Sequence, residues 1–397
     1  MVAMVSHAGS EINRRAFLRS ALAASAYLIA GRAEQPPAHA AGLDGERRFA
    51  PVKVSRDRII REVVGLRPYR PEGFVVDAER VGDKLLIHNY GHGGAGITLS
   101  WGTASLALDL ARDFPGARPS RPGRRSRPAA RRRFAVLGCG VNGLSTALLL
   151  QRRFQDGPGT VTIYAKDLPP ETTSNIAGGF WYPTSVYDPR AASAKFTEQF
   201  RLACRVSNRA FQLLVGPEYG VRWIDTVELY RDEASLGDEL VGGNDLYPQM
   251  EAHRDAERFF GFPYARRYST MLIEPPIYLD ALLRDFYIAG GKLVAKEFHS
   301  REEVLRLPEP VIFNCTGLGA RALFGDQKLG PVRGQLEVLL PQPEVDYCYL
   351  SSGYMFPRRD GIILGGTWNH DDWSLTPKAK HTTRILEEHA EIMRGLK

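Results

Sequence analysis

Cysteine is scarce in this sequence of 397 residues, and its few thiols are scattered along the chain. There are four cysteines, and no two of them have the spacing of a C-x-x-C pair or of a metal-binding set. We therefore expect no metal site, and we interpret the four thiols as buried apolar residues. The sequence also contains no visible internal repeat and no apparent Ser/His/Asp triad.

Acidic residues are absent from one basic stretch, residues 114–133, which reads FPGARPSRPGRRSRPAARRR and contains eight arginines. The first forty residues add four arginines against two glutamates, so the formal net charge of +7 leaves −3 for the rest of the chain. The basic balance is therefore no evidence for a nucleic-acid partner, and we expect none. With no apolar periodicity, residues 114–133 are predicted to be a linker between residues 41–113 and residues 134–397.

A long apolar run is also missing from residues 1–40. Arg14 and Arg15 precede an Ala-rich run of about a dozen residues, which is too short to cross a bilayer of roughly 30 Å. The segment ends in an A-x-A cleavage pattern at 38–40. It resembles a twin-arginine export signal, which implies folding before export, the export machinery as a partner, and a periplasmic or extracellular location. A retained membrane anchor is the alternative.

A dinucleotide-binding fingerprint opens the long segment. FAVLGCGVNGLSTALLL (134–150) reads as a strand, a glycine turn and a helix, and a second strand, TVTIYA, follows at 160–165. Gly138 allows the tight turn, Gly140 lets the backbone approach a pyrophosphate, and Gly143 lets the helix pack on the strand. The helix start then offers free N–H groups to phosphates.

Three further stretches carry groups suited to a dinucleotide. Asp167, with Lys166 before it, closes the second strand and is the only candidate acid for a ribose hydroxyl. PPETTSNIAGGFWYP (169–183) offers hydroxyls at Thr172, Thr173 and Ser174 to phosphates, and its paired glycines, Gly178 and Gly179, let the backbone pass close to a flat ring. FNCTG (313–317), which includes Thr316, is a plausible wall against an adenosine.

A second glycine loop, HNYGHGGAGIT (88–98), comes before the fingerprint and leads into a predicted helix at 101–114. Just ahead of it, GLRPYRP (65–71) sets Arg67 and Arg70 in a proline-stiffened stretch. A fixed guanidinium pairs bidentately with a carboxylate. The stretch therefore suits a carboxylate-bearing ligand, while a solvated surface position is the alternative for each arginine taken singly.

Taken together, these motifs resemble the D-amino-acid oxidase family of FAD enzymes. The fingerprint, the Thr/Gly loop, NCTG, Arg333-Gly334-Gln335 and Leu364-Gly365-Gly366 follow the family order. LRPYRP and IHNYGHGGAGITLSWGTA match the family's C-terminal signature, yet they come first here. The resemblance implies an α/β fold, with a Rossmann-like FAD-binding domain and a mainly antiparallel substrate domain. Circular permutation is the simplest account, because joining the chain's end to the short segment restores the usual order.

The resemblance also implies site residues and a reaction. Arg67 and Tyr354 would hold the substrate carboxylate, the Gly94 carbonyl would accept from the amine, and Tyr182 would face the substrate. Further residues would contact FAD: Gly138, Gly140, Val141, Asn142, Gly143, Lys166, Asp167, Thr173, Ser174, Gly178, Gly179, Phe298, Thr316, Gly93, Gly94, Ala95, Gly96, Ile97 and Thr98. The expected reaction is oxidative deamination of D-amino acids by hydride transfer to FAD, giving 2-oxo acids, ammonia and, with oxygen, hydrogen peroxide.

Some positions depart from the family pattern. Leu350 stands where the family often has a second tyrosine, and Gly319 replaces a tryptophan that commonly follows NCTG. We interpret His88 and His92 as hydrogen-bonded scaffolding of the glycine loop. Trp368 and Trp373 are interpreted as packing residues.

Alternative functions remain open. A glycine or sarcosine type of amine oxidase and a quinone-linked D-amino-acid dehydrogenase share the same carboxylate clamp, and a flavin-binding protein without turnover is a third possibility. A homodimer is also possible.

Overall fold

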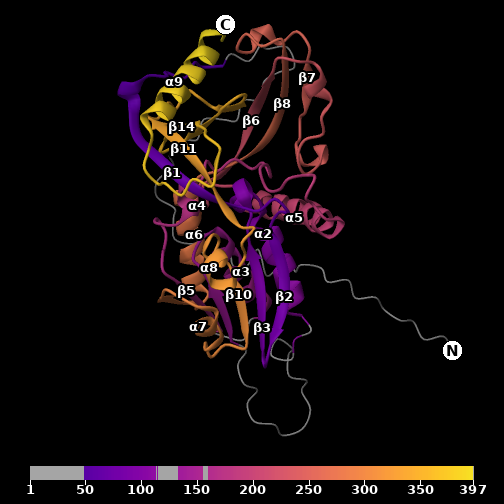
Figure 1. The fold of residues 1–397 in the computed structure, drawn as a ribbon. Coiled ribbons are helices and arrows are strands. Elements are labelled where there is room, and N and C mark those ends of the chain that lie inside the picture. Colours follow the sequence, from indigo (N-terminus) through magenta and orange to yellow (C-terminus); the bar gives the residue numbers. More distant parts are fainter. Residues whose placement is uncertain (1–48, 113, 115–132, 155–159, 397) are drawn as a thin grey trace, which may run out of the picture. The chain divides into compact units, whose positions relative to one another are not determined.

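The computed structural model describes residues 49–112, 114, 133–154 and 160–396. The predicted export signal at 1–40, and the predicted linker apart from its two end residues, lie outside these ranges. The described residues belong to one unit, Phe49–Lys397, which is built from two β-sheets with helices packed around them (Figure 1). This architecture confirms the predicted mixed α/β class.

The first sheet has six strands and contains the fingerprint strand. Its order is β2 (Val75–Val81), β3 (Lys84–Tyr90), β10 (Val311–Asn314), β4 (Phe134–Leu137), β5 (Val161–Ala165) and β9 (Lys292–Ala295). All neighbouring strands are parallel except β2 and β3. The side chains of β4 and β10 are buried along their whole length, as expected for parallel strands covered on both faces.

Helices with apolar faces pack around this sheet. The main ones are α2 (Gly96–Leu110), α3 (Val141–Arg153), α5 (Ala194–Gln212) and α6 (Pro275–Ile288), and three shorter ones are α4 (Thr173–Ile176), α7 (Arg301–Leu305) and α8 (Gly319–Phe324). On α5, Phe196, Phe200, Cys204 and Phe211 recur at helical spacing and are buried. In the described part of the chain, no helix combines the length and apolarity that a membrane span requires.

One predicted helix has the wrong start. The helix expected over 101–114 begins at Gly96 and ends at Leu110, so the last residues of the glycine loop form its first turn. The sequence hides this start because a glycine at the first helical position is a poor helix former. The earlier start matters because the amino end of α2, with its unpaired N–H groups, then lies within the glycine loop.

The second sheet has nine strands. Along its path these are β1 (Ile59–Tyr69), β11 (Gly330–Leu339), β14 (Gly361–Gly365), β13 (Tyr354–Arg358), β12 (Tyr347–Leu350), β6 (Val221–Tyr230), β8 (Tyr264–Ile273) and β7 (Glu251–His253), while β15 (Asn369–His370) pairs with β11. Only the β12–β6 pair is parallel. The sheet is therefore mainly antiparallel, as predicted, and the helix α9 (Ala379–Arg394) packs against β11 and β14.

The segment before the predicted linker belongs to both sheets. Strand β1 pairs with β11, and β3 lies between β2 and β10 (Figure 1). The start of the described chain also meets its end, since the Val52 N–H donates to the Met393 Sδ at 3.2 Å. Phe49 and Val52 share one apolar cluster with Ile392. Residues far apart in sequence thus build each layer together.

Candidate active site

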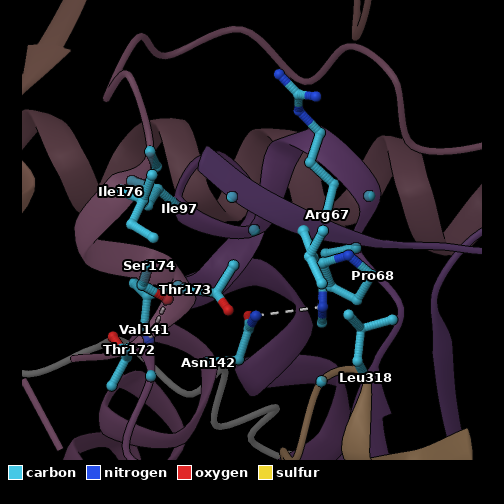
Figure 2. A pocket seen from close by; sticks show the side chains of 18 of the residues that line it. Arg67, Pro68, Ile97, Val141, Asn142, Thr172, Thr173, Ser174, Ile176 and Leu318 are labelled. Atoms are coloured by element: carbon cyan, nitrogen blue, oxygen red, sulfur yellow. Dashed lines mark hydrogen bonds between the residues drawn. The ribbon is translucent and has the colours of Figure 1, made fainter. Parts of the chain in front are cut away.

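A cavity of about 940 Å³ lies between the two sheets. Residues at the carboxyl ends of β3, β4, β5 and β10 line one side, which is where open parallel sheets bind their ligands. Strands β1, β11 and β13 line the other side. Figure 2 shows Arg67 and Pro68 of β1 around the same cavity as Asn142 and Ser174. Nearly all predicted site residues therefore meet here.

The turn after β4 confirms the roles of two fingerprint glycines. Gly138 has a φ of +99°, and a Cβ on it would lie 2.6 Å from the carbonyl oxygen of Cys315, so both backbone and space require glycine. A Cβ on Gly143 would overlap the carbonyl oxygen of Gly138, which confirms the close helix–strand packing. Gly143 does not line the cavity, and a direct cofactor contact there stays a prediction.

The amino end of α3 faces the cavity through Gly140, Val141 and Asn142. The Val141 N–H donates to the Ser174 Oγ at 3.0 Å, which leaves the Ser174 hydroxyl proton available to a ligand. Thr173 also lines the cavity, whereas the Thr172 hydroxyl donates to the Asn175 Oδ1 at 2.7 Å. The helix dipole and the free N–H groups suit phosphate at this end.

A buried amide supplies a test of whether a dinucleotide fits. Asn89 is fully buried and lines the cavity, and its Nδ2 donates to the Thr146 Oγ1 at 3.2 Å. Its Oδ1 has no hydrogen-bond partner among the described residues. Because an orphaned buried acceptor is costly, a ligand hydroxyl at this point would satisfy it. The phosphate-type helix end, the orphaned acceptor and the cavity volume together fit FAD.

The far end of the cavity, beyond β5, is more polar than the sequence suggests. Lys166 Nζ lies 3.9 Å from the Asp167 Oδ2 and 3.7 Å from the Glu297 Oε1. Glu297 and Phe298 line the cavity with Asp167 and Thr316. Asp167 is therefore not the only acid at this end. Glu297 escapes sequence reasoning because it follows β9, which is distant in sequence and becomes a neighbour of β5 only through strand pairing.

The loop after β3 passes very close to another loop. Gly93 has a φ of +55°, and a Cβ on it would overlap the Ser185 carbonyl oxygen. That same carbonyl accepts from the Gly94 N–H at 3.0 Å. Gly93, Gly94, Gly96, Ile97 and Thr98 all line the cavity. Ala95 is buried and does not line it, and the predicted cofactor contact there stays a prediction.

His92 connects this loop to the fingerprint helix. Asn142 Nδ2 donates to the His92 Nδ1 at 3.2 Å, and the His92 Nε2–H donates to the Thr103 Oγ1 at 3.0 Å. Because the Thr103 hydroxyl donates onward to the Leu99 carbonyl, it accepts from the imidazole, which is therefore neutral. Burial lowers the pKa of His92 to about 3. His92 is scaffolding, as predicted.

His88, which lies on β3 four residues before His92, also holds neighbouring elements together. Its Nδ1 accepts from the Asn314 Nδ2 at 3.0 Å, and its Nε2 lies 3.2 Å from the Glu79 Oε1. Burial lowers the pKa of His88, against the opposing hydrogen bond from Glu79. His88 thus ties β3 to β10, and the scaffolding prediction is confirmed for it as well.

The two arginines of LRPYRP have different surroundings. Arg70 pairs with Asp326, with Nε at 2.8 Å from Oδ2, and donates to the Gly73 carbonyl. Arg67 lines the cavity and donates through Nη1 to the Thr367 carbonyl at 3.2 Å. No carboxylate of the described residues forms an ion pair with it. A side chain on Gly334 of β11 would collide with the Arg67 guanidinium, which explains the glycine of Arg-Gly-Gln.

Tyr354 stands on a stack of aromatic rings. Its ring lies 4.8 Å from that of Phe356, which in turn lies 4.8 Å from the ring of Phe180. The Tyr354 hydroxyl lies near Gly366, where a Cβ would be 2.8 Å away, and it finds no hydrogen-bond partner within the described ranges. Both Tyr354 and Arg67 thus offer donors to a ligand in the cavity.

Tyr182 presents its ring to the cavity and its hydroxyl to a buried cluster. The Glu228 carboxylate acts on that hydroxyl through its charge, and the Glu228 Oε1 accepts from the Tyr268 hydroxyl at 3.0 Å. Burial, then the Glu228 charge, raises the pKa of Tyr182. Tyr182 lines the cavity, and its role toward the substrate stays a prediction.

Gly178 and Gly179, which follow the threonines of the Thr/Gly loop, have no room for side chains within the protein. A Cβ on Gly179 would overlap the Ile273 carbonyl oxygen, and one on Gly178 would lie 2.9 Å from the Phe356 ring. Both residues line the cavity. The neighbouring strands therefore require glycine at both positions. Close passage beside a flat ring of a ligand stays a second, predicted reason.

The packing interpretation of the two C-terminal tryptophans is wrong. Trp368 is 40% exposed and Trp373 is 53% exposed. Trp368 lines the cavity, and the Arg67 Cζ lies 5.0 Å from its ring centroid. The sequence held no signal for this placement, because Trp368 is brought to Arg67 by the pairing of β1, β11 and β15.

The cysteines behave as predicted. All four are free and buried, and burial raises the pKa of the Cys139 and Cys315 thiols to about 12. Across the part of the chain that the structure describes, no group of three His, Cys, Asp or Glu side chains is arranged to hold a metal ion.

Several known proteins resemble this chain. A "D-amino-acid oxidase" of Rubrobacter xylanophilus is 34% identical over 277 residues, which covers 66% of this chain and 77% of the relative. A human "D-aspartate oxidase" is 30% identical over 263 residues, covering 64% and 74%. Among solved structures, iminodiacetate oxidase from Chelativorans sp. BNC1 has a TM-score of 0.50 and 17% identity, covering 66% of this chain and 79% of the other. That likeness shows the fold alone.

The family match spans both segments of the chain. The family model described as "FAD dependent oxidoreductase" (DAO) matches residues 33–110 and 133–397. The two matched blocks fall on either side of the Arg/Pro-rich stretch, and together they include every residue that lines the cavity. The chain is thus an FAD-dependent enzyme that belongs to the DAO family of oxidoreductases.

Proposed function

We propose that this protein oxidatively deaminates D-amino acids, with oxygen as electron acceptor, to 2-oxo acids, ammonia and hydrogen peroxide. The observation that carries the proposal is the Arg67 guanidinium, which lines the cavity without a carboxylate partner in the described chain, with the Tyr354 hydroxyl on the same side. A free guanidinium and a free phenol suit a ligand carboxylate. The relatives named as D-amino-acid and D-aspartate oxidases support the same substrate type.

In this proposal, the residues around Arg67 hold different groups of the substrate. Arg67 and Tyr354 orient the carboxylate, and the Gly94 carbonyl accepts from the amine, so that the Cα–H is held in one direction. When bound, FAD supplies the redox chemistry as acceptor of the Cα hydride. The protein needs no acid–base pair for that step, and its contribution is orientation.

The opposite side of the cavity holds the cofactor in this proposal. Gly140, Val141, Asn142 and Ser174 receive the diphosphate at the start of α3, and Lys166, Asp167, Glu297, Phe298 and Thr316 receive the adenosine end. The N–H groups of Gly96, Ile97 and Thr98, in the first turn of α2, would stabilise negative charge on the flavin ring.

The substrate side chain is expected to be neutral. Among the described residues, Arg67 is the only charged one that the nine-stranded sheet and its loops contribute to the cavity lining, and its neighbours there include Leu350, Tyr354, Phe356 and Trp368. A second carboxylate, as in D-aspartate, would lose water without gaining a cation. We therefore place D-alanine or D-phenylalanine ahead of D-aspartate.

Anaerobic bleaching of the bound flavin tests the proposal. Neutral D-amino acids should reduce the flavin, L-amino acids should not, and peroxide should appear once oxygen is admitted. Arg67→Ala should retain bound FAD but lose reduction by about a thousand-fold or more, since its bidentate pair orients the substrate. Arg61→Ala, on the exposed edge of the same strand, is the matched control.

Other results would redirect the function. Reduction by glycine or sarcosine alone would favour the amine-oxidase alternative, and reduction without peroxide would favour a quinone-linked dehydrogenase. A flavin that no amino acid bleaches would contradict catalysis and leave a flavin-binding protein.

We also infer that the chain is a circular permutant of its family. The support is the contact of residues 49–52 with α9 and β12: the Val52 N–H donates to Met393 of α9, and the Tyr347 hydroxyl of β12 donates to the Ala50 carbonyl at 2.8 Å. A rearranged gene that starts at residue 134 and joins residue 397 to residue 49 should fold and bind FAD. Failure of that protein to bind FAD would count against the inference.

Export by the twin-arginine route is a further part of the proposal. Its support is the sequence of residues 1–40 alone, with Arg14 and Arg15 ahead of the apolar run. Replacing both arginines by lysine should retain a fused reporter in the cytoplasm, whereas unchanged export would contradict the route.

A further inference from the structure

We propose that Trp368 is a positioning residue of the carboxylate clamp, which holds the Arg67 guanidinium in place for the substrate. The inference rests on the proposed function, because it concerns the same clamp. It assigns a role to a residue that sequence reasoning treats as packing.

The first support is the direct stack. The Arg67 Cζ lies 5.0 Å from the centroid of the Trp368 ring, within the range of a cation–π interaction, for which tryptophan is the best partner. Both residues line the cavity. Other protein groups beside the guanidinium are the Thr367 carbonyl at 3.2 Å and the backbone of Gly334. The stack is therefore a principal restraint on a side chain that has no anionic partner in the described chain.

The second support is that the tryptophan ring is itself held. Its Nε1–H donates to the His370 Nε2 at 2.8 Å, and Tyr69 packs edge-on against both rings, at 6.1 Å from Trp368 and 5.5 Å from His370. An indole with 40% exposure would otherwise rotate among rotamers, and each of these contacts reduces that freedom. Trp368 thus reaches Arg67 in one orientation.

The third support lies in the loop that carries Trp368. Asn369 and His370 pair with Arg333 and Val332 of β11, the same strand that flanks Arg67. Arg333 is fully buried, and it donates to the Ser374 carbonyl at 2.9 Å and to the Thr376 carbonyl at 2.6 Å. The loop is therefore tied to the sheet at the residues that follow Trp368, and the stack is formed before any substrate arrives.

Trp373 provides a natural comparison within the same loop. It is more exposed than Trp368, at 53%, and it neither lines the cavity nor stacks on an arginine in the described chain. A tryptophan kept only for the loop's own stability should behave alike at both positions. If the ring instead acts on the carboxylate clamp, substitution of Trp368 should weaken substrate binding and substitution of Trp373 should not.

Two substitutions of Trp368 distinguish the effect of an aromatic ring face from the effect of apolar volume. Trp368→Leu keeps bulk without a π face, and we expect it to raise the KM for D-phenylalanine about ten-fold, as loss of a partly desolvated cation–π contact predicts. The kcat should change by less than about two-fold. Trp368→Phe keeps a ring face and should restore the KM to within about three-fold of native. Trp373→Leu should leave both constants unchanged.

A binding measurement tests the proposal without turnover. 3-Phenylpropionate has the carboxylate and side chain of phenylalanine but no amine, so its Kd, from the change in flavin absorbance of the holoenzyme, reports the clamp alone. The Kd should weaken in the order native, Trp368→Phe, Trp368→Leu. If Trp368→Leu binds like Trp368→Phe, or if Trp373→Leu weakens binding equally, the proposal is overturned. If no D-amino acid reduces the flavin, the proposed function fails, and this Kd series still decides the role of Trp368.

Discussion

Two glycine-rich loops meet at the cavity, and they use glycine for different purposes. GCGVNG (138–143) packs against elements of its own sheet, the end of β10 and the strand β4, so its glycines lie among rigid backbone. HNYGHGGAGIT (88–98) passes Ser185, which belongs to a loop. Each leads into a helix whose amino end faces the cavity, α3 or α2. One loop is supported by regular structure and the other by a second loop.

Gly143→Ala should have the largest effect, because nothing near it can move. The new Cβ would overlap the Gly138 carbonyl oxygen between α3 and β4. We expect a loss of about 3 kcal/mol or more in the free energy of unfolding, and weak or no FAD binding. Urea unfolding and FAD titration measure the two effects. A variant that binds FAD like the native protein would show that this turn is not rigid.

Gly93→Ala should have a smaller effect, although its Cβ also overlaps a carbonyl oxygen and its φ is positive. The Ser185 loop can shift, so we expect a loss of about 2 kcal/mol. Gly82→Ala is the matched control, with a φ of +60° but no neighbour within 4 Å; it should cost about 1 kcal/mol. If Gly93→Ala costs as much as Gly143→Ala, both loops are equally rigid and the comparison fails.

Asn142→Ala should uncouple the two loops. It removes the donor to the His92 Nδ1 and leaves a buried acceptor unpaired, at a cost of about 1–3 kcal/mol. The Kd for FAD should rise, because both helix ends are held less firmly. An unchanged Kd would mean that each loop is positioned independently of the other.

The pH dependence of stability should report the same contact. His92 has its pKa lowered to about 3 from an ordinary 6.5, so the unfolded chain binds more protons than the folded chain between these values. Its contribution to stability is complete above about pH 6.5 and is lost progressively as the pH falls toward 3. The melting temperature should therefore fall more between pH 7 and pH 5 in the native protein than in His92→Gln. Equal slopes would show that His92 is not buried as a neutral ring.

Local patterns were sufficient to predict the main elements but not the boundaries at functional points. The fingerprint strand, its helix and the second strand were predicted closely because apolar spacing and a glycine turn are local signals. The start of α2 at Gly96 was missed because no capping residue marks it. The difference lies in what stabilises each end, since the first turn of α2 is held by packing against the rest of the molecule.

Single residues of the site also differ in whether a local sequence pattern could predict their surroundings. Arg67 and Arg70 have the same sequence surroundings, three residues apart, and only strand pairing reveals that Asp326 neutralises one and not the other. Glu297 and Trp368 carry no motif, and each reaches the cavity through the strand that precedes or follows it. Hydroxyls such as Thr172, predicted for phosphate, find partners inside the protein.

By itself, the sequence determined the family, the FAD fingerprint and the α/β class, because glycine patterns and apolar periodicity are local and chemically specific. It also predicted an arginine for a ligand carboxylate. Tertiary structure alone decided which arginine is free, which tryptophan stacks on it, and where the second glycine loop becomes a helix. Those outcomes depend on strands that are distant along the chain and adjacent in the sheet, as β1 is to β11, and no local pattern records such pairings.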